Sequence, residues 1–285
     1  MRFGIIGHPV AGSMSPRLFG AAYDGRYPYD LLDYEQFADA WARFLDGYDG
    51  INVTAPYKQD AFAHVQKLSD NARLSGAVNL VVRDGLSGYN TDVDGVLYAL
   101  TSGASLDKGF DAPGAAHGQI ASVAARPCSG QIASVAARPC PLMKQAVSSR
   151  FQDCDALVVG AGGAARAAVV AAKLLGCRVT VCNRTHSKAA TLADELNCDC
   201  IPLADVSSIA PDLIIYTLPG SAPVPEGLPF ASAIVLEAEY KAPVLAHIPC
   251  KAYLSGRLWL LGQAAAGYEL FTGEKPSVEK MLQVL

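Results

Sequence analysis

The chain has 285 residues, of which 51% are apolar and 18% are charged, and its formal net charge is -4 at pH 7. This length and composition predict a globular protein with one large or two ordinary domains. The mild acidic balance and the lack of a lysine-rich run argue against nucleic acid or an anionic membrane as a general partner.

The N-terminus, "MRFGIIGHPV", passes from a short apolar run directly into Gly7 and Pro9. It lacks the apolar core and the small-residue cleavage site of a signal peptide, so we expect a cytoplasmic protein. The longest apolar segment, 156–176, is interrupted by Arg166 and Lys173, which argues against a membrane span.

The eight cysteines form no C-x-x-C pair and have no histidine-rich segment near them. Only one residue separates Cys198 from Cys200, and no second pair accompanies them, so we predict no metal site. The cysteines are expected to be reduced and mostly structural.

Short apolar runs alternate with helix-like stretches at the start of the chain. The pattern predicts strands at 2–7, 29–34 and 50–55, with helices at 15–23 and 35–47 between them. Alternation at this length is typical of βαβ units around a mostly parallel sheet that is covered on both faces.

A duplicated segment follows this first half. The sequence "GQIASVAARPC" occupies 118–128 and recurs letter for letter at 130–140. A single short tandem copy is not a solenoid, which needs several stacked repeats. Because surface loops absorb insertions at small entropic cost, we interpret 103–150 as a linker that carries a duplication, with no predicted binding role.

The strand–helix–strand pattern returns at 155–185 around "GAGGAA". Gly160 permits a tight bend, Gly162 lets the backbone approach a pyrophosphate, and Ala165 allows close packing of helix on strand. A phosphate would then lie at the positive end of the helix. The alternative is a glycine-rich turn without a ligand, but a second strand at 177–183 follows at the distance expected of a dinucleotide site. The predicted cofactor contacts are Gly160, Ala161, Gly162, Gly163 and Ala164.

The residues after that second strand, Asn183, Arg184 and Thr185, indicate which dinucleotide is bound. A carboxylate there would bond to the ribose 2′-hydroxyl of NAD and repel a 2′-phosphate. Arg184 can pair with the phosphate while Asn183 and Thr185 add neutral hydrogen bonds, so the sequence favours NADP. A surface arginine without a ligand is the alternative. No Walker lysine follows the glycines, which disfavours nucleotide hydrolysis.

Polar residues gather at the predicted strand ends of the first half. In "GSMSP", the hydroxyls of Ser13 and Ser15 could hold a carboxylate, although Ser15 could instead be a helix N-cap. Asp92, in "NTDVDG", could likewise cap the helix that follows. Lys58, which ends "INVTAPYK", would on its own be interpreted as a solvated surface charge.

Seven motifs in order resemble those of the shikimate dehydrogenase family: "SMSP", "NVTAPYK", "GAVN", "NTD", "GAGGAARA", "NRT" and "GQAAAGYELFTG". The resemblance covers nearly the whole chain. It implies an N-terminal α/β substrate domain and a Rossmann-like, doubly wound parallel-sheet NADP domain, with the active site in the cleft between them. The expected bounds are 1–102 and 151–261, and a C-terminal helix, 262–285, would return to the first domain.

By this resemblance, Lys58 and Asp92 are the acid–base pair. Oxidation of a ring hydroxyl removes a proton from oxygen as a hydride leaves carbon for nicotinamide, and a lysine in a closed cleft can take or return that proton. Gln263 could instead be a structural residue of an amphipathic helix. The implied substrate contacts are Ser13, Ser15 and Tyr240 for a carboxylate, and Thr54, Asn79, Asp92 and Gln263 for ring hydroxyls.

Several positions depart from the family pattern. "YTLPGSAPVP" replaces the usual Asn-Ala-Thr-Pro, and Glu237 replaces an aspartate, with no Asn-Pro or Thr-Pro element after it. Phe19 and Gly20 replace His-Asn. Trp259 stands where a methionine commonly packs against nicotinamide, and an indole there would narrow the pocket or stack on the ring.

The sequence therefore predicts a cytoplasmic NADP-dependent oxidoreductase that reversibly reduces 3-dehydroshikimate to shikimate in the chorismate pathway of aromatic amino acid biosynthesis. Two alternatives stay open. One keeps Lys58 and Asp92 but takes quinate or an amino analogue as its substrate. The other is a non-catalytic NADP-binding sensor, which the altered region 216–245 would favour. The sequence is compatible with a monomer or a homodimer.

Overall fold

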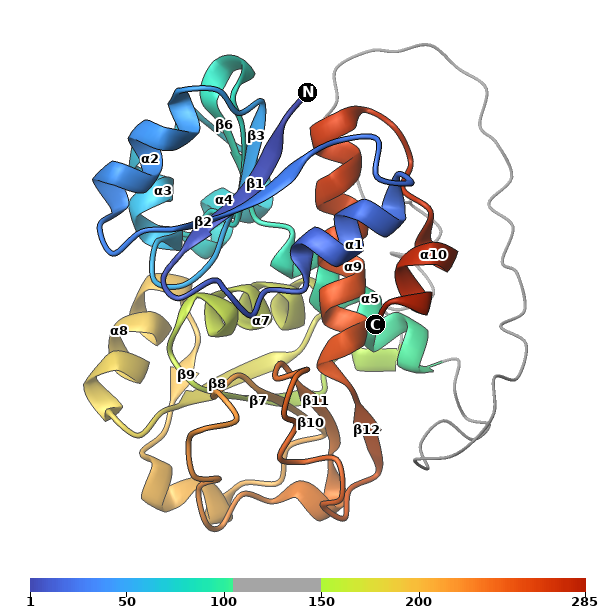
Figure 1. Ribbon diagram of the computed structural model, residues 1–285. Helices are drawn as coiled ribbons and strands as arrows, with labels where there is room; N and C mark the ends of the chain where they lie inside the picture. Colours follow the sequence, from blue (N-terminus) through green and yellow to red (C-terminus); the bar gives the residue numbers. More distant parts are fainter. Residues whose placement is uncertain (105–149) are drawn as a thin grey trace.

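The computed structural model describes residues 1–104 and 150–285. The duplicated segment 118–140 lies outside the described residues, as does the predicted linker apart from its ends. Two six-stranded sheets, one from each half of the chain, lie one above the other with helices against their faces (Figure 1). This arrangement confirms the predicted α/β fold class with two sheets.

The first sheet has the strand order β2-β1-β3-β5-β6-β4. β1 and β3 are buried throughout because helices cover both faces, which explains their continuous apolar sequences. β1 pairs in parallel with β2 and β3, and β4 with β6, whereas β5 is antiparallel to both of its neighbours. The strands are β1 Phe3–Gly7, β2 Tyr29–Asp33, β3 Gly50–Val53, β4 Lys67–Leu68, β5 Leu80–Val82 and β6 Ser87–Tyr89.

The helices of the first half begin near the ends of these strands. α2 is amphipathic and buries Ala40, Trp41 and Phe44. The expectation that Ser15 is an N-cap is wrong, because α1 begins at Ser15 itself and Met14 precedes it without a side-chain cap. The helices are α1 Ser15–Ala22, α2 Phe37–Leu45, α3 Lys58–His64, α4 Asp70–Ser75 and α5 Asp92–Ala104, with a short 3₁₀ turn, η1 Asp84–Leu86.

The second sheet has the order β12-β11-β10-β7-β8-β9, and all of its pairings are parallel. The strand order reverses between β7 and β10, and in such doubly wound sheets ligands bind at the carboxyl ends of the strands beside this point. The strands are β7 Asp155–Val159, β8 Arg178–Cys182, β9 Asp199–Cys200, β10 Leu213–Tyr216, β11 Ile234–Glu237 and β12 Ala252–Leu254. The remaining elements are α7 Gly163–Leu174, α8 His186–Leu196, η2 Leu203–Ser208, η3 Phe230–Ser232, α9 Gly256–Thr272 and α10 Val278–Gln283.

The C-terminal helices α9 and α10 leave the second sheet and pack against the first half, beside α5 and α1 (Figure 1). Phe271 of α9 stacks on Phe3 of β1, with ring centroids 4.9 Å apart. α5 and α9 approach closely because Gly262 has no side chain: a Cβ there would lie 2.5 Å from the Cβ of Tyr98. No helix within the described residues is long and apolar enough to cross a membrane.

Helix α5 is shared by the two halves. Its Val93, Val96 and Leu100 belong to the same buried cluster as the alanine-rich helix α7 of the second half. α5 also packs along α9, which joins the aromatic core of the first half. The N-terminus of α5 is therefore held in position relative to both sheets.

Candidate active site

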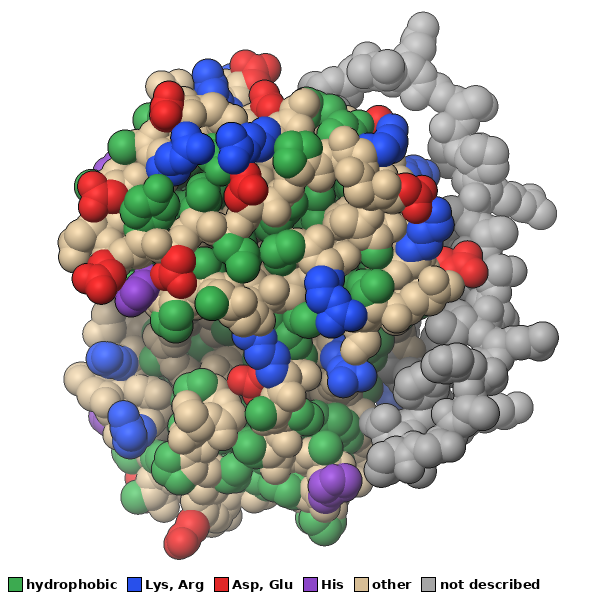
Figure 2. Space-filling view, in the orientation of Figure 1, with side chains coloured by type: hydrophobic (Ala, Val, Ile, Leu, Met, Phe, Trp, Pro, Cys, Tyr) green, Lys and Arg blue, Asp and Glu red, His purple; other side chains and the backbone are tan. Residues whose placement is uncertain are grey.

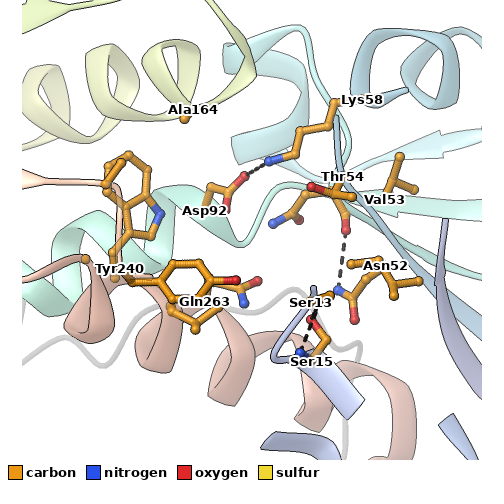
Figure 3. A pocket seen from close by; sticks show the side chains of 16 residues that line it. Ser13, Ser15, Asn52, Val53, Thr54, Lys58, Asp92, Ala164, Tyr240 and Gln263 are labelled. Atoms are coloured by element: carbon orange, nitrogen blue, oxygen red, sulfur yellow. Dashed lines mark hydrogen bonds and ion pairs between the residues drawn. The ribbon is translucent and has the colours of Figure 1, made fainter. Parts of the chain in front are cut away.

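A pocket between the two halves brings together all of the residues predicted to contact the substrate. Its volume is about 180 Å³, well below the roughly 300–1,000 Å³ of sites for drug-sized ligands, which suits a small single-ring compound. Ala164 of the dinucleotide turn also lines it (Figure 3). The predicted substrate residues in its lining are Ser13, Ser15, Thr54, Lys58, Asn79, Asp92, Tyr240 and Gln263.

Lys58 and Asp92 form an ion pair inside this pocket (Figure 3). Lys58 is the first residue of α3 and Asp92 the first residue of α5, so two helix starts meet at the pair. The exposed fractions of the two side chains are 17% and 12%. Partial removal from water strengthens such a pair. Because the Lys58 side chain is largely buried and paired, the interpretation of Lys58 as a solvated surface charge is wrong.

The dinucleotide turn approaches Lys58 from the second half. A Cβ on Gly163 would lie only 3.0 Å from Cδ of Lys58, so the start of α7 packs directly against the lysine side chain. Ala164, the next residue, faces the same pocket. The predicted cofactor turn and the predicted proton donor are therefore neighbours.

A hydrogen-bond network positions the loop before Asp92. The backbone N–H of Thr91 donates to Oδ1 of Asn79 over 2.8 Å, and Nδ2 of Asn79 donates back to the Thr91 hydroxyl over 3.1 Å. The Thr91 hydroxyl also donates to Oε1 of Gln263 over 3.5 Å. Asn90 fixes Asp92 itself, because its Oδ1 accepts from the Asp92 N–H over 3.2 Å. Four polar residues from three segments, of which Asn90 and Thr91 share one, are thus mutually oriented around the carboxylate.

The opposite end of the pocket is built from hydroxyl groups. The Ser13 hydroxyl donates to Oγ of Ser15 over 3.1 Å, and the Ser15 N–H donates to Oγ of Ser13 over 3.2 Å. Tyr240 reaches the same end from the second half (Figure 3). Burial raises the pKa of Tyr240 more than a backbone hydrogen bond to Met14 lowers it, so the phenol stays protonated and can donate. Each of these neutral hydroxyls can donate one hydrogen bond to a carboxylate oxygen.

The glycine turn has the geometry expected of a dinucleotide site. Gly160 has φ +124°, which favours glycine, and a Cβ there would collide with the hydroxyl of Thr217. Ala161, Gly162 and Gly163 line a second hollow together with residues of α8 from Ser187 to Glu195. The turn therefore faces both the pocket, through Ala164, and this second hollow.

The predicted 2′-phosphate residues lie at the carboxyl end of β8, outside the linings of both hollows. Nδ2 of Asn183 donates to the carbonyl of Thr185 over 3.1 Å, and Thr185 is the N-cap residue of α8. The side chain of Arg184 is exposed. Lys188 follows in the first turn of α8 and lines the second hollow. It was not among the predicted cofactor contacts, although a basic residue one helical turn after "NRT" could have indicated it.

Two further residues of the pocket were absent from the predicted contacts. Asn52, in the middle of β3, is buried, accepts from the hydroxyl of Tyr29 over 2.7 Å and donates to the carbonyl of Asn79 over 3.4 Å. Its signal was a polar residue inside an apolar strand. Trp259, noted only as a departure from the family pattern, lines the pocket with 5% of its surface exposed.

Glu237 holds in place the loop that carries Tyr240, although the sequence of this loop departs from the family pattern. Its fully buried carboxylate accepts from the N–H of Val244 over 2.7 Å, from the N–H of Leu245 over 3.2 Å and from the hydroxyl of Tyr253 over 2.7 Å. These bonds fold the loop after β11 back onto the strand.

No group of three or more His, Cys, Asp or Glu side chains among the described residues could hold a metal ion.

Three family models match the chain. Residues 5–81 match the shikimate dehydrogenase substrate binding domain. Residues 142–223 match the shikimate / quinate 5-dehydrogenase model, and residues 260–285 match the shikimate 5′-dehydrogenase C-terminal domain.

Solved structures of similar proteins have the same arrangement. Shikimate 5-dehydrogenase from Thermus thermophilus, in complex with NADP(H) and shikimate, has a TM-score of 0.72 at 26% identity, covering 100% of this chain and 98% of that one. Shikimate dehydrogenase from Mycobacterium tuberculosis has a TM-score of 0.70 at 25% identity, covering 99% and 97%. Quinate dehydrogenase from Corynebacterium glutamicum, in complex with NAD, has a TM-score of 0.73 at 22% identity over 100% and 98%, which shows the fold alone.

Curated relatives share this similarity over more than nine tenths of their length. The NADP(+) shikimate dehydrogenase of Bacillus licheniformis is 31% identical over 99% of this chain and 95% of its own. The corresponding enzyme of Acidiphilium cryptum is 32% identical over 98% and 93%. The similarity to these relatives shows that the chain belongs to the shikimate dehydrogenase family, and its pocket and dinucleotide turn agree with this.

Proposed function

We propose that this protein is an NADP-dependent shikimate dehydrogenase, which reversibly reduces 3-dehydroshikimate to shikimate on the route to aromatic amino acids. The observation that carries the proposal is the Lys58–Asp92 ion pair in a small pocket whose edge is formed by Ala164 of the dinucleotide turn. The relatives named for NADP(+) and shikimate, and the Thermus thermophilus complex with both compounds, support the same activity.

Lys58 and Asp92 carry out the proton transfer. When bound, the nicotinamide supplies or accepts the hydride. Lys58 donates a proton to the ring oxygen during reduction and takes it back during oxidation. Asp92 holds the lysine in place and, as a hydrogen-bond acceptor, orients the ring hydroxyl next to it. Because Gly163 packs against Lys58 and Ala164 lines the pocket, the cofactor side of the cleft lies next to the reacting oxygen.

The remaining contacts divide by chemistry. We propose that the hydroxyls of Ser13, Ser15 and Tyr240 bind the substrate carboxylate, since all three line one end of the pocket. The ring hydroxyls would bind to Thr54, Asn79, Asp92 and Gln263. The proposed cofactor contacts are Gly160, Ala161, Gly162, Gly163 and Ala164 for the nucleotide backbone and Asn183, Arg184 and Thr185 for the 2′-phosphate.

The same proposal divides the chain into functional units. Residues 1–102 and the returning segment 262–285 form the substrate unit, and residues 151–261 form the NADP unit. Support comes from the two separate sheets and from the packing of Phe271 on Phe3.

The test is the initial rate of NADP reduction with shikimate, followed by the absorbance of the reduced nicotinamide, for the wild type and Lys58→Ala. We expect saturable activity in the wild type and a loss of roughly 100-fold or more in kcat for the variant. Quinate and NAD serve as parallel arms, and both should give a much lower kcat/KM. A wild type that binds NADPH but oxidises neither acid would overturn the proposal in favour of a sensor.

A further inference from the structure

Lys241 reaches from the second half to the loop that carries the two serines. A Cβ on Gly12 would lie 3.0 Å from Nζ of Lys241, so the ammonium group rests against the backbone just before Ser13. Lys241 follows β11 in the loop of Tyr240, and its Nζ lies 5.7 Å from the centroid of the Tyr240 ring, within the range of a cation–π contact. One cation therefore lies beside both components of the hydroxyl end of the pocket.

This ammonium group has no acidic partner within the described parts of the chain. The nearest carboxylate in sequence, Glu239, accepts from the backbone N–H groups of Lys241 over 2.7 Å, Gly220 over 3.3 Å and Ala242 over 3.4 Å. Burial raises the pKa of Glu239, but these N–H groups together outweigh burial and lower it. Glu239 is thus ionised and directed at the backbone, which leaves the charge of Lys241 available.

The hydroxyl end of the pocket needs such a charge. Ser13, Ser15 and Tyr240 are neutral donors, and a carboxylate taken out of water against neutral groups alone is poorly compensated. Among the described residues, Lys58 is the only lysine or arginine in the pocket lining, and Asp92 neutralises it. Figure 2 shows further lysine and arginine side chains near the boundary between the two halves on this face. The position of Lys241 next to Gly12 follows from the close approach of its Nζ to that glycine.

We propose that Lys241 is a further substrate-binding residue, which recognises the charge of the substrate carboxylate across the cleft. The inference rests on the proposed function, because it assumes a carboxylate at the hydroxyl end. Since Lys241 comes from one half and the serines from the other, an anion at this end attracts the two halves toward each other. A carboxylate therefore favours the closed cleft that brings Gly163 to Lys58.

The first test compares Lys241→Met with the wild type. We expect the KM for shikimate to rise roughly 5- to 20-fold, as is typical for the loss of one charge-assisted contact, while kcat and the KM for NADP change less than about twofold. Lys241→Arg should recover most of the lost affinity. Lys251→Met is the matched control, because Lys251 is another exposed lysine of the second half that neither lines the pocket nor lies beside Gly12, and it should leave the KM unchanged.

The second test removes the substrate charge instead. With the methyl ester of shikimate, the wild type and Lys241→Met should have kcat/KM values within about twofold of each other, because the ester offers no anion. The wild-type kcat/KM for shikimate should also fall more steeply with added KCl than that of the variant. An equal loss with acid and ester would mean that Lys241 only packs the loop, and would overturn the inference.

Calorimetric titration of both proteins with shikimate in the presence of NADP separates this inference from the proposed function. If the wild type oxidises shikimate and the KM of Lys241→Met stays within twofold, the role of Lys241 is wrong and the dehydrogenase stands. If the wild type binds shikimate without turnover, a weaker Kd of Lys241→Met still supports the inference, and an equal Kd overturns it. A wild type that neither binds nor oxidises shikimate overturns both.

Discussion

Lys58 and Asp92 are the first residues of helices α3 and α5, and they form an ion pair with each other. α5 packs against α7 of the second half and α9 of the first, so the carboxylate has a fixed position relative to both sheets. The lysine lies on a short helix and contacts the dinucleotide turn at Gly163. Its orientation therefore depends on Asp92, whose position the rest of the fold determines.

Asp92→Asn should lower kcat for shikimate oxidation by roughly 100-fold or more while NADPH binding is retained, because the amide no longer holds or balances the charge of Lys58. Initial rates and a fluorescence titration with NADPH measure the two quantities. Asp60→Asn, which changes an exposed carboxylate on α3, is the matched control and should keep wild-type rates. A full kcat in Asp92→Asn would contradict this role.

Arg184→Ala should lower kcat/KM for NADP by roughly 10- to 100-fold and leave kcat/KM for NAD within about twofold, because only NADP carries the 2′-phosphate. The two cofactors are compared by initial rates at saturating shikimate. Arg178→Ala removes an exposed arginine at the opposite end of β8 and should change neither value. An equal loss with both cofactors would show that Arg184 acts on the fold rather than on the phosphate.

Gly95→Ala should destabilise the protein by about 1–3 kcal/mol, because its Cβ would lie 2.5 Å from the backbone oxygen of Trp259 and 2.6 Å from its ring. Gly20→Ala is the matched helical control: a Cβ there meets nothing within 4 Å, so the better helix propensity of alanine should stabilise α1 by up to about 1 kcal/mol. Urea unfolding measures both changes. Equal effects of the two substitutions would contradict the close packing of α5 on α9.

Asp94→Asn should stabilise the protein at neutral pH. The pKa of Asp94 is raised from 3.8 to about 6: burial raises it most, hydrogen bonds from Asn71 and from the Asp94 backbone N–H lower it, and the nearby charge of Asp92 raises it. A raised folded-state pKa gives stability that is fully present below about pH 4 and is lost as the pH rises through 6. The asparagine has no proton to lose, so its advantage should be on the order of 1–3 kcal/mol at pH 7.5 and fade toward pH 4.

Thermal melts of the wild type and Asp94→Asn across this pH range measure the difference. The amide of Asn71 can still donate to the new side chain, so the substitution isolates the charge. A difference in melting temperature that does not change between pH 4 and 7.5 would show that folding does not raise the pKa of Asp94.

Local sequence patterns predicted much of the fold. The buried strands β1 and β7 were visible as apolar runs because both of their faces are covered. The turn at Gly160 was visible because its positive φ favours glycine. The capping role considered for Ser15 was wrong, because a serine before a proline indicates a helix start but not which residue stands first. Such boundaries depend on the packing of α1 against the C-terminal helices.

By itself, the sequence determined the two α/β halves and the dinucleotide turn, which follow from local periodicity and turn chemistry. The resemblance of its ordered motifs to the family implied eight of the polar residues that line the pocket. Only the tertiary structure decided that α5 belongs to both cores, that Asn52 faces the pocket and that Lys241 lies against Gly12. These contacts join segments far apart in the chain. They depend on how α5 and α9 set one sheet against the other, and no local pattern records that packing.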